Sequence, residues 1–355
     1  MRLVSPFLRK VVYPTLAMSG VFRRIAAGGL AVVTYHGVVP PGYRPVDAAF
    51  DGNLVSAKSL GQQVRRLKAR YNVISPEDVL AWRQGECELP HRAVLLTCDD
   101  GLLNCLTDML PVLQEEGVKC LFFITGNAVA EASTGEGRSR LWYEELFLLI
   151  LGAPAGQFEV SYGGITIASE LGSREQRRAM WWTAVMRLSQ VDAETRGSFL
   201  SALRERLGSR GRDPEDSVSC RRFGLMNGEE LRRLAAAGMT IGAHTMSHPI
   251  LAQLPVELAR AEVAESRSRL EAALQQRVWA FAYPFGDAPS VTAEVMALPE
   301  QAGYTAAFLN YGGGLGAQLP AYALPRIHVT SEMSLSELEA HVSGFYRQLR
   351  QSVSG

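Results

Sequence analysis

Short apolar segments alternate along the chain with longer segments in which apolar residues recur every three or four positions. The short segments have the length of buried strands, and the longer ones have the period of amphipathic helices. Strands are expected at Leu30–Tyr35, Tyr71–Ile74, Ala93–Thr97, Cys120–Ile124, Met239–Ala243, Val278–Tyr283, Thr305–Leu309 and Arg326–Val329. This alternation is typical of parallel α/β folds, and seven or eight β-α units in series predict a closed or nearly closed barrel.

Helix boundary signals lie between these strands. Ser56 is expected to cap a helix that begins at Ala57, and Ser75, followed by two acidic residues, is expected to cap the next. Asn227 has the same position before Gly228, and Gly238 follows the helix as a stop signal. Helices are expected at Ala57–Arg70, Leu103–Glu116, Gly228–Ala237 and Glu257–Gln275.

Residues from about 130 to 222 interrupt the alternation and are interpreted as an insertion. The pattern predicts a helix at Trp142–Leu151, a hairpin at Phe158–Ile167 and two helices between about 174 and 207. Gly208–Asp216 combines Gly, Ser, Pro and charge, which indicates a linker. Four aromatic residues of the insertion fit either its core or a surface that stacks on sugar rings, and their helical spacing favours the core. They are Trp142, Tyr143, Trp181 and Trp182.

The composition excludes some classes of protein. With 47% hydrophobic and 20% charged residues, the chain is expected to be ordered and globular. Lys plus Arg and Asp plus Glu number 36 each, so no net positive field attracts nucleic acid. The five cysteines form no CxxC pair, and their odd number argues against a disulfide framework and favours a reducing compartment.

The N-terminal region is basic, with no acidic residue before Asp47. Its apolar stretch from Val11 to Phe22 is interrupted by Pro14 and Gly20, is too short to span a membrane and lacks the pattern of a signal peptide. A cytoplasmic location is therefore expected. Residues 1–28 form a basic amphipathic segment that either packs on the protein's own surface or contacts the inner surface of a membrane, and both alternatives stay open.

Two of the expected strands end in candidate chemistry. The strand from Ala93 leads into Asp99 and Asp100, and the strand from Met239 leads into His244 and His248. The carboxyl ends of barrel strands share one rim, where catalytic groups of α/β barrels lie. Two imidazoles and one carboxylate form a ligand set for a divalent ion such as zinc that leaves positions open for water and substrate.

Each of these motifs also has a plainer interpretation. Asp100 followed by glycine is ordinary turn chemistry, and two histidines separated by three residues are a weak signal of a metal site. His36 ends the first expected strand and either contacts substrate or has a structural role. The two motifs together carry more weight than either one alone.

Their combination resembles the polysaccharide deacetylase family, the NodB-homology domains of carbohydrate esterase family four. The T-x-D-D-G motif corresponds to residues 97–101 and the H-[ST]-x-x-H motif to residues 244–248. Residues 282–285 resemble the third motif, R-x-P-[YF], and residues 324–328 resemble the last one. The similarity covers about residues 29–129 and 222–335. It implies a distorted (β/α)7-type barrel at 29–335 with an inserted, mainly helical segment, followed by a C-terminal helix at 336–355.

The resemblance also implies a role for each matching residue. One divalent ion, zinc with cobalt or nickel as alternatives, would be bound by Asp100, His244 and His248. The implied general base is Asp99, and the implied oxyanion donor is the backbone N–H of Phe285. His328 is the candidate general acid, with a surface strand histidine beside Arg326 as the alternative. Tyr283 and Pro284 of the third motif are expected substrate contacts, together with His36. Ala282 stands where many relatives have the arginine that orients the base. Either another cation takes this role, with Arg326 the nearest candidate by motif, or Asp99 is tuned differently.

The implied activity is metal-dependent hydrolysis of an acetyl group, with N-acetyl expected, on a sugar of a polysaccharide, glycolipid or lipid-linked saccharide precursor. Two alternatives stay open: a catalytically silent sugar-binding protein on the same barrel, and a hydrolase of a small non-sugar amide. The complete set of two acids and two histidines favours catalysis, because a barrel that only binds sugar has no need of metal ligands.

Overall fold

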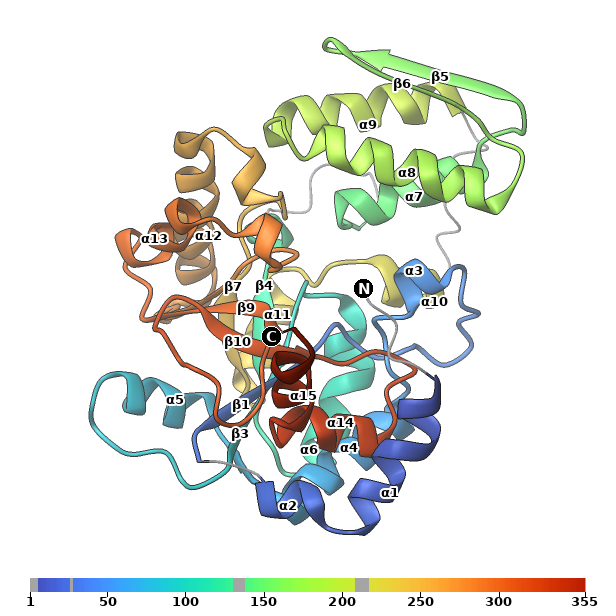
Figure 1. Ribbon diagram of the computed structural model, residues 1–355. Coiled ribbons are helices and arrows are strands. Elements are labelled where there is room, and N and C mark those ends of the chain that lie inside the picture. Colours follow the sequence, from blue (N-terminus) through green and yellow to red (C-terminus); the bar gives the residue numbers. More distant parts are fainter. Residues whose placement is uncertain (1–5, 26–27, 130–137, 208–216, 355) are drawn as a thin grey trace.

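The computed structural model describes residues 6–25, 28–129, 138–207 and 217–354 (Figure 1). The strands are β1 (Leu30–Tyr35), β2 (Asn72–Ile74), β3 (Ala93–Cys98), β4 (Leu121–Ile124), β5 (Gln157–Tyr162), β6 (Ile165–Glu170), β7 (Thr240–Ala243), β8 (Ala280–Ala282), β9 (Ala306–Gly312) and β10 (Leu324–His328). The α-helices are α1 (Tyr13–Met18), α2 (Val21–Ile25), α3 (Ala48–Asp51), α4 (Ala57–Arg70), α5 (Pro76–Arg83), α6 (Leu110–Glu115), α7 (Trp142–Gly152), α8 (Arg174–Leu188), α9 (Ala193–Leu207), α10 (Ser217–Phe223), α11 (Gly228–Ala236), α12 (Val256–Leu274), α13 (Ala293–Gln301), α14 (Leu335–Val342) and α15 (Phe345–Ser354). Short π-helical or 3-10 segments are η1 (Leu8–Val12), η2 (Cys105–Met109), η3 (Gly126–Val129), η5 (Leu251–Gln253) and η6 (Ala288–Ser290).

Seven parallel strands form a closed barrel. Their order is β1-β10-β9-β8-β7-β4-β3, and pairing between β3 and β1 closes the ring. The eighth strand, β2, pairs with the first half of β3, whereas β4 pairs with its second half on the same edge. The expected seven-stranded α/β barrel is confirmed, and each of the eight expected strands is present with its ends shifted by at most three residues.

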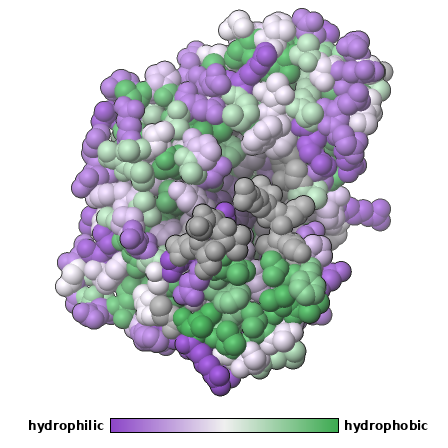
Figure 2. All heavy atoms as spheres, in the orientation of Figure 1, coloured by the Kyte–Doolittle hydropathy of each residue, from purple (hydrophilic) through white to green (hydrophobic). Residues whose placement is uncertain are grey.

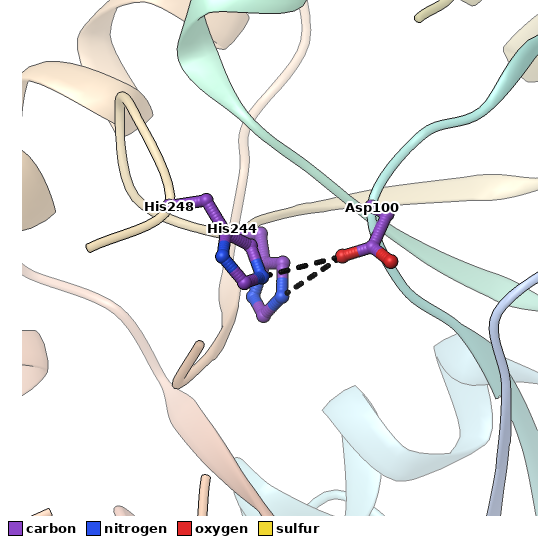
Figure 3. A group of neighbouring side chains, drawn as sticks. All are labelled: Asp100, His244 and His248. Atoms are coloured by element: carbon purple, nitrogen blue, oxygen red, sulfur yellow. Dashed lines mark ion pairs between the residues drawn. The ribbon is translucent and has the colours of Figure 1, made fainter. Parts of the chain in front are cut away.

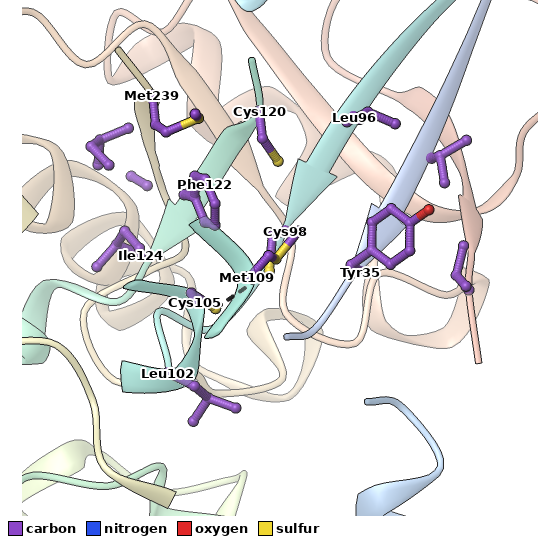
Figure 4. Packing of buried hydrophobic residues seen from close by; sticks show 14 of the residues in the cluster. Tyr35, Leu96, Cys98, Leu102, Cys105, Met109, Cys120, Phe122, Ile124 and Met239 are labelled. Atoms are coloured by element: carbon purple, nitrogen blue, oxygen red, sulfur yellow. Dashed lines mark hydrogen bonds between the residues drawn. The ribbon is translucent and has the colours of Figure 1, made fainter. Parts of the chain in front are cut away.

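Residues of each barrel strand alternate between two packing environments. In β1, Ala31, Val33 and Tyr35 pack toward the helices, whereas Leu30 and Val32 pack with the cluster that fills the barrel interior. Figure 4 shows part of the outer layer, where the buried thiols of Cys98, Cys105 and Cys120 pack among apolar side chains. All five cysteines are free, as expected for a chain without a disulfide framework.

The expected helix caps are confirmed. The Ser56 hydroxyl accepts a hydrogen bond from the Ser59 N–H. Ser75 and Asn227 each form a capping box with the acid three residues later, Asp78 and Glu230 respectively. These caps fix where the helices begin, and so they fix the lengths of the loops at the barrel rim.

The insertion forms a separate packing unit over one end of the barrel (Figure 1). Helices α7, α8 and α9 and the β5–β6 hairpin enclose their own apolar cluster, which includes Phe147, Trp181 and Phe199. The expected helix, hairpin and helix pair are all present. The linker predicted at Gly208–Asp216 lies outside the described residues.

The N-terminal helices pack on the protein's own surface. Tyr13 and Phe22 are buried in a small cluster with Ala340 of α14, and the Phe22 ring lies 5.5 Å from that of Phe345 in α15. The inner face of this segment therefore packs on the protein's own surface, which is one of the two alternatives that the sequence leaves open. In the part of the chain that the structure describes, no helix is both long and apolar enough to cross a membrane.

Candidate active site

The barrel interior changes from apolar to polar toward the carboxyl ends of its strands. Alternation places the inward positions at Leu30, Val32, Thr34 and then His36 along β1, and at Ala93, Leu95, Thr97 and then Asp99 along β3. Thr34 pairs with both Thr97 and His328 in the strand register. Polar side chains of β1, β3 and β10 therefore lie at one level of the barrel.

Arg326 of β10 binds Asp99 with both arms of its guanidinium. Its Nη1 lies 2.7 Å from Asp99 Oδ1, and its Nη2 lies 2.6 Å from Oδ2. The same group donates to the hydroxyls of Thr34 and Thr97, and the Arg326 side chain is fully buried. Burial raises the pKa of Asp99, but Arg326 and, more weakly, His244 outweigh it and hold this pKa below its usual range. The predicted contact between Arg326 and the candidate base is present.

Asp100, His244 and His248 converge on one point (Figure 3). Asp100 Oδ1 lies 3.6 Å from His244 Nε2 and 3.4 Å from His248 Nε2, and all three ligand atoms lie within 4.8 Å of one another. A tetrahedral zinc ion with ligands at about 2.0–2.1 Å holds neighbouring ligand atoms about 3.4 Å apart. The spacing of the three side chains therefore fits a divalent ion.

The protonation states of these groups also suit metal binding. His244 Nδ1 lies 2.7 Å from the Ala282 carbonyl oxygen, so it carries the proton and leaves Nε2 free as a ligand. Burial lowers the pKa of His244 to about 4, which keeps the ring neutral at pH 7. Burial raises the pKa of Asp100, but the hydrogen bond with His248 and the charge of His36 outweigh it and keep this pKa far below its ordinary value.

Backbone strain is concentrated at this site. Six non-glycine residues in the described ranges have positive φ, and four of them belong to the site: Asp100, Thr245, His248 and Phe285. Such conformations are costly for residues with a Cβ and persist where the surroundings enforce them. Gly286 follows Phe285 with a φ of 62°, and a Cβ there would lie 2.7 Å from the Asn310 nitrogen, so this turn requires glycine.

A cavity of about 350 Å³ opens beside these side chains, which is within the usual range for small-ligand sites. The barrel lines it with His36, Asp99, Asp100, His244, His248, Phe285, Asp287, Asn310 and His328, and the insertion lines it with Tyr143, Glu144, Trp181, Trp182 and Val185. Trp181 is 8% exposed and its indole N–H donates to the Tyr143 carbonyl, whereas Trp182 is 47% exposed. Trp142 and Trp181 thus fit the core interpretation, and Trp182 presents its ring to solvent at the cavity.

His36 and His328 lie next to each other at the cavity, close to Asp99. Their rings are 4.6 Å apart, and His36 Nε2 lies 3.9 Å from Asp99 Oδ2. Burial, followed by the charge of His36, lowers the pKa of His328 to about 3, so this imidazole is neutral at pH 7. The structure therefore brings both histidines to the site, but holds His328 in its basic form.

One predicted substrate contact needs correction. Tyr283 is 1% exposed, belongs to the outer core cluster and donates its hydroxyl to the Tyr322 carbonyl oxygen. Strand alternation turns it away from the interior, where its neighbour Ala282 packs. Neither Tyr283 nor Pro284 is among the described residues that line the cavity, whereas the next residue, Phe285, is.

Sequence reasoning missed a buried charge network at the cavity. Arg222 of α10 donates to Asp51 Oδ1 and Glu144 Oε1, both at 2.9 Å, and all three side chains are buried. Burial raises the pKa of Glu144 to about 6, although Arg222 opposes this shift. Acids in the first turn of α7 are ordinary for a helix start, so the sequence holds no signal that singles out Glu144.

Fold and site together define a (β/α)7 barrel with a candidate metal centre at the carboxyl ends of its strands. The sequence profile of the polysaccharide deacetylase family matches residues 87–163 and 216–307 and leaves out most of the insertion. Over these two segments, which make up just under half of the chain, the sequence is similar to this family.

Individual relatives are more distant. YxkH of Bacillus subtilis (strain 168), a protein named after the same family, is 26% identical over 114 residues, which span 32% of this chain and 40% of YxkH. The deacetylase PplD of Streptococcus pyogenes, solved with acetate, aligns over 88% of this chain and 97% of its own, with a TM-score of 0.56 and 17% identity. IcaB from Ammonifex degensii gives the same coverage and identity with a TM-score of 0.54. At such identities the solved structures establish the fold.

Proposed function

We propose that the protein is a metal-dependent deacetylase that removes an acetyl group, preferentially N-acetyl, from a sugar. The observation that carries the proposal is the convergence of Asp100, His244 and His248 within 4.8 Å, directly beside the Asp99–Arg326 pair. Zinc suits two imidazoles and one carboxylate, and cobalt or nickel are the alternatives. The match to the polysaccharide deacetylase profile and the acetate complex of PplD support the same reaction.

Each residue of the site has a separate role in the proposed reaction. A divalent ion held by Asp100, His244 and His248 would polarise the acetyl carbonyl and lower the pKa of a water molecule toward about 7. Asp99 accepts the proton of the attacking water. Arg326 orients this carboxylate as a positioning residue and is itself held by the hydroxyls of Thr34 and Thr97 and by the Leu309 carbonyl oxygen. The backbone N–H of Phe285 stabilises the oxyanion. His328 is neutral at rest, so the proton that it passes to the leaving amine is the one that Asp99 has taken from the water.

Trp182 supports a saccharide as the substrate. Sugar rings have apolar faces that pack on aromatic side chains, and a half-exposed indole beside a polar cavity offers such a face. His36 lines the same cavity next to Asp99 and is the second proposed substrate contact. The acceptor is a sugar unit of a polysaccharide, glycolipid or lipid-linked precursor of a cell-surface polysaccharide.

The outer face of the N-terminal helices supports a location at the inner surface of a membrane. Phe7 is 63% exposed, Met18 is 81% exposed and Val11 is 48% exposed. Figure 2 shows apolar residues gathered on the lower part of this face, over α1. Lys10, Arg23 and Arg24 supply positive charge on the same segment, which suits an anionic lipid surface.

Acetate release tests the activity. Metal-loaded protein is incubated with a panel of N- and O-acetylated saccharides and small acetylated amides, and Asp100→Ala serves as the control. The proposal predicts acetate from a saccharide, its loss with a chelator, and no product from the variant. Glycan binding without acetate release would favour the silent sugar-binding alternative, and turnover confined to small amides would favour the other hydrolase.

Vesicle sedimentation tests the location. Vesicles of phosphatidylglycerol and phosphatidylcholine should retain the protein, and Met18→Glu should release it. Leu258→Glu, on an apolar residue of α12 that is 38% exposed, is the matched control and should leave binding unchanged. Equal sedimentation of both variants, or no sedimentation of the unmodified protein, would remove the membrane from the proposal.

A further inference from the structure

Side chains of the insertion donate hydrogen bonds to the loop that carries the two candidate histidine ligands. Trp142, at the start of α7, donates its indole N–H to the His248 carbonyl oxygen at 3.0 Å. Arg196, on α9, donates from Nη2 to the Ser247 hydroxyl at 2.5 Å. Both side chains are buried, with Arg196 only 2% exposed. Residues more than 50 positions away in sequence therefore hold the segment between His244 and His248.

The side chains of Trp142 and Arg196 also contact each other. The Arg196 guanidinium carbon lies 4.8 Å from the centre of the Trp142 ring, and its Nη1 donates to the carbonyl oxygens of Leu188 and Val191 at 3.3 Å. A buried guanidinium with fixed acceptors and an aromatic neighbour keeps one geometry. A displacement of α7 or α9 would therefore also displace the loop between His244 and His248.

The barrel holds the same loop from the opposite side. Glu262 of α12 accepts the Ser247 N–H at 2.8 Å and the Ser247 hydroxyl at its other oxygen. Ser247 thus lies between the positive charge of the insertion and a negative charge of the barrel. This arrangement locks the residue immediately before His248.

The loop needs such support because its backbone is strained. Thr245 has a φ of 62° and His248 a φ of 59°, and a β-branched residue such as Thr245 is especially unfavourable there. Within the loop, the Thr245 hydroxyl accepts the His248 N–H at 3.0 Å. The hydrogen bonds from outside the loop, at the His248 carbonyl and at Ser247, stabilise this strained backbone further.

We infer that the insertion sets the metal affinity of the barrel, with Trp142 and Arg196 as positioning residues that hold the His248 imidazole in its ligand geometry. The inference rests on the proposed function only in that Asp100, His244 and His248 are the ligands. Groups that orient metal ligands typically change metal affinity by roughly ten- to 100-fold when they are removed. The insertion then has a task beyond covering the cavity.

Calorimetric titration of metal-free protein with zinc, and the visible absorption spectrum of the cobalt-loaded protein, test the inference. Trp142→Phe keeps the ring but removes the indole N–H, and Arg196→Gln removes the charge. Each is expected to weaken zinc binding roughly ten- to 100-fold and to change the cobalt spectrum. Arg196→Lys should recover part of the affinity, since it restores the charge without the fork of donors.

Arg204→Gln is the matched control, because Arg204 lies on the same helix but pairs with Glu145 of α7. Zinc affinity in this variant should equal that of the unmodified protein. Folded Trp142→Phe and Arg196→Gln variants with unchanged affinity and spectrum would overturn the inference, and Trp142→Phe alone decides the matter if Arg196→Gln does not fold. Undiminished zinc binding by Asp100→Ala would instead contradict the proposed metal site itself.

Discussion

The barrel and the insertion each place a buried acid beside the cavity, in opposite electrostatic environments. Both oxygens of Asp99, from the barrel, are held by Arg326, and its pKa is lowered. Only one oxygen of Glu144, from the insertion, is held by Arg222, and burial raises its pKa to about 6. Asp99 is therefore ionised throughout the neutral range and can accept a proton, whereas Glu144 titrates close to neutrality.

The two regions also deliver their side chains differently. Barrel side chains reach the site from the ends of parallel strands, where alternation and register fix their direction. Those of the insertion come from helices that pack on a separate apolar cluster. The difference indicates that the barrel supplies the chemistry, while the insertion supplies a wall of the cavity and the support of the histidine loop.

Replacing Asp99 by Asn should have the largest effect on turnover. Loss of a general base typically costs about 10²- to 10⁴-fold in rate. Acetate release measures the loss, and zinc content should stay at that of the unmodified protein. Glu144→Gln, the corresponding change in the insertion, should lower the rate less than tenfold. Equal losses in both variants would break the assignment of chemistry to the barrel alone.

Removing Arg326 should have the largest effect on stability. In Arg326→Ala the Asp99 carboxylate stays buried without its partner, and breaking such a pair costs roughly 3–5 kcal/mol in the free energy of unfolding. Denaturant titration of the metal-free protein measures this loss. Arg326→Lys keeps one charged contact and should lose less. An unchanged midpoint for Arg326→Ala would mean that Asp99 is not held as described.

Acid should destabilise the barrel through its buried histidines. Burial lowers the pKa of His244 to about 4 and that of His328 to about 3, whereas an unfolded histidine titrates near 6.5. Below about pH 6.5 the unfolded chain binds protons that the folded barrel does not, so the free energy of unfolding falls as the pH falls toward 4. Asp99, whose folded pKa is lowered, adds its own loss only below the usual range of an aspartate.

Denaturant titrations of the metal-free protein at pH 7 and pH 5 test this dependence. Each histidine that stays neutral lowers the free energy of unfolding by up to about 1.4 kcal/mol per pH unit. Burial also lowers the pKa of His341 in α14 to about 4, so this residue adds to the loss, whereas the raised pKa of Glu144 opposes it. The same titrations of the Glu144→Gln variant remove the opposing contribution of Glu144. Equal free energies at both pH values in this variant would contradict the neutral state of the buried histidines in the folded protein.

Local signals explain what the sequence predicts well. Apolar runs mark the strands and the polar residues that follow them mark the rim, so the sequence predicts the group of Asp100, His244 and His248. The contact of Arg326 with Asp99 followed from the family resemblance, because 227 residues separate the two in the chain. Nothing local indicates that β2 lies outside the ring, since its sequence is that of any short strand.

Long-range packing explains what the sequence predicts poorly. The network of Asp51, Glu144 and Arg222 joins residues 78 and 171 positions apart, and each alone reads as a charge near a helix end. The resemblance of residues 282–285 to the third family motif predicts Tyr283 at the substrate, but strand alternation places its side chain in the outer core cluster. Neighbouring residues of a helix point about 100° apart, so Trp181 and Trp182 of α8 do not point in the same direction. The periodicity predicts buried aromatic residues on this helix, but it does not show which of the two tryptophans is exposed.

Trp182 gives the smallest expected effect and the finest test of the comparison. An indole that stacks on a sugar ring contributes about 0.5–1.5 kcal/mol, so Trp182→Ala should raise KM for a saccharide substrate by roughly two- to tenfold with little change in kcat. Tyr162→Ala is the matched control, because Tyr162 is equally exposed on the hairpin of the insertion, at 45%, and does not line this cavity. A fall in kcat at constant KM would place the indole in the chemistry and not in substrate binding. The division between a catalytic barrel and a binding insertion would then fail at this residue.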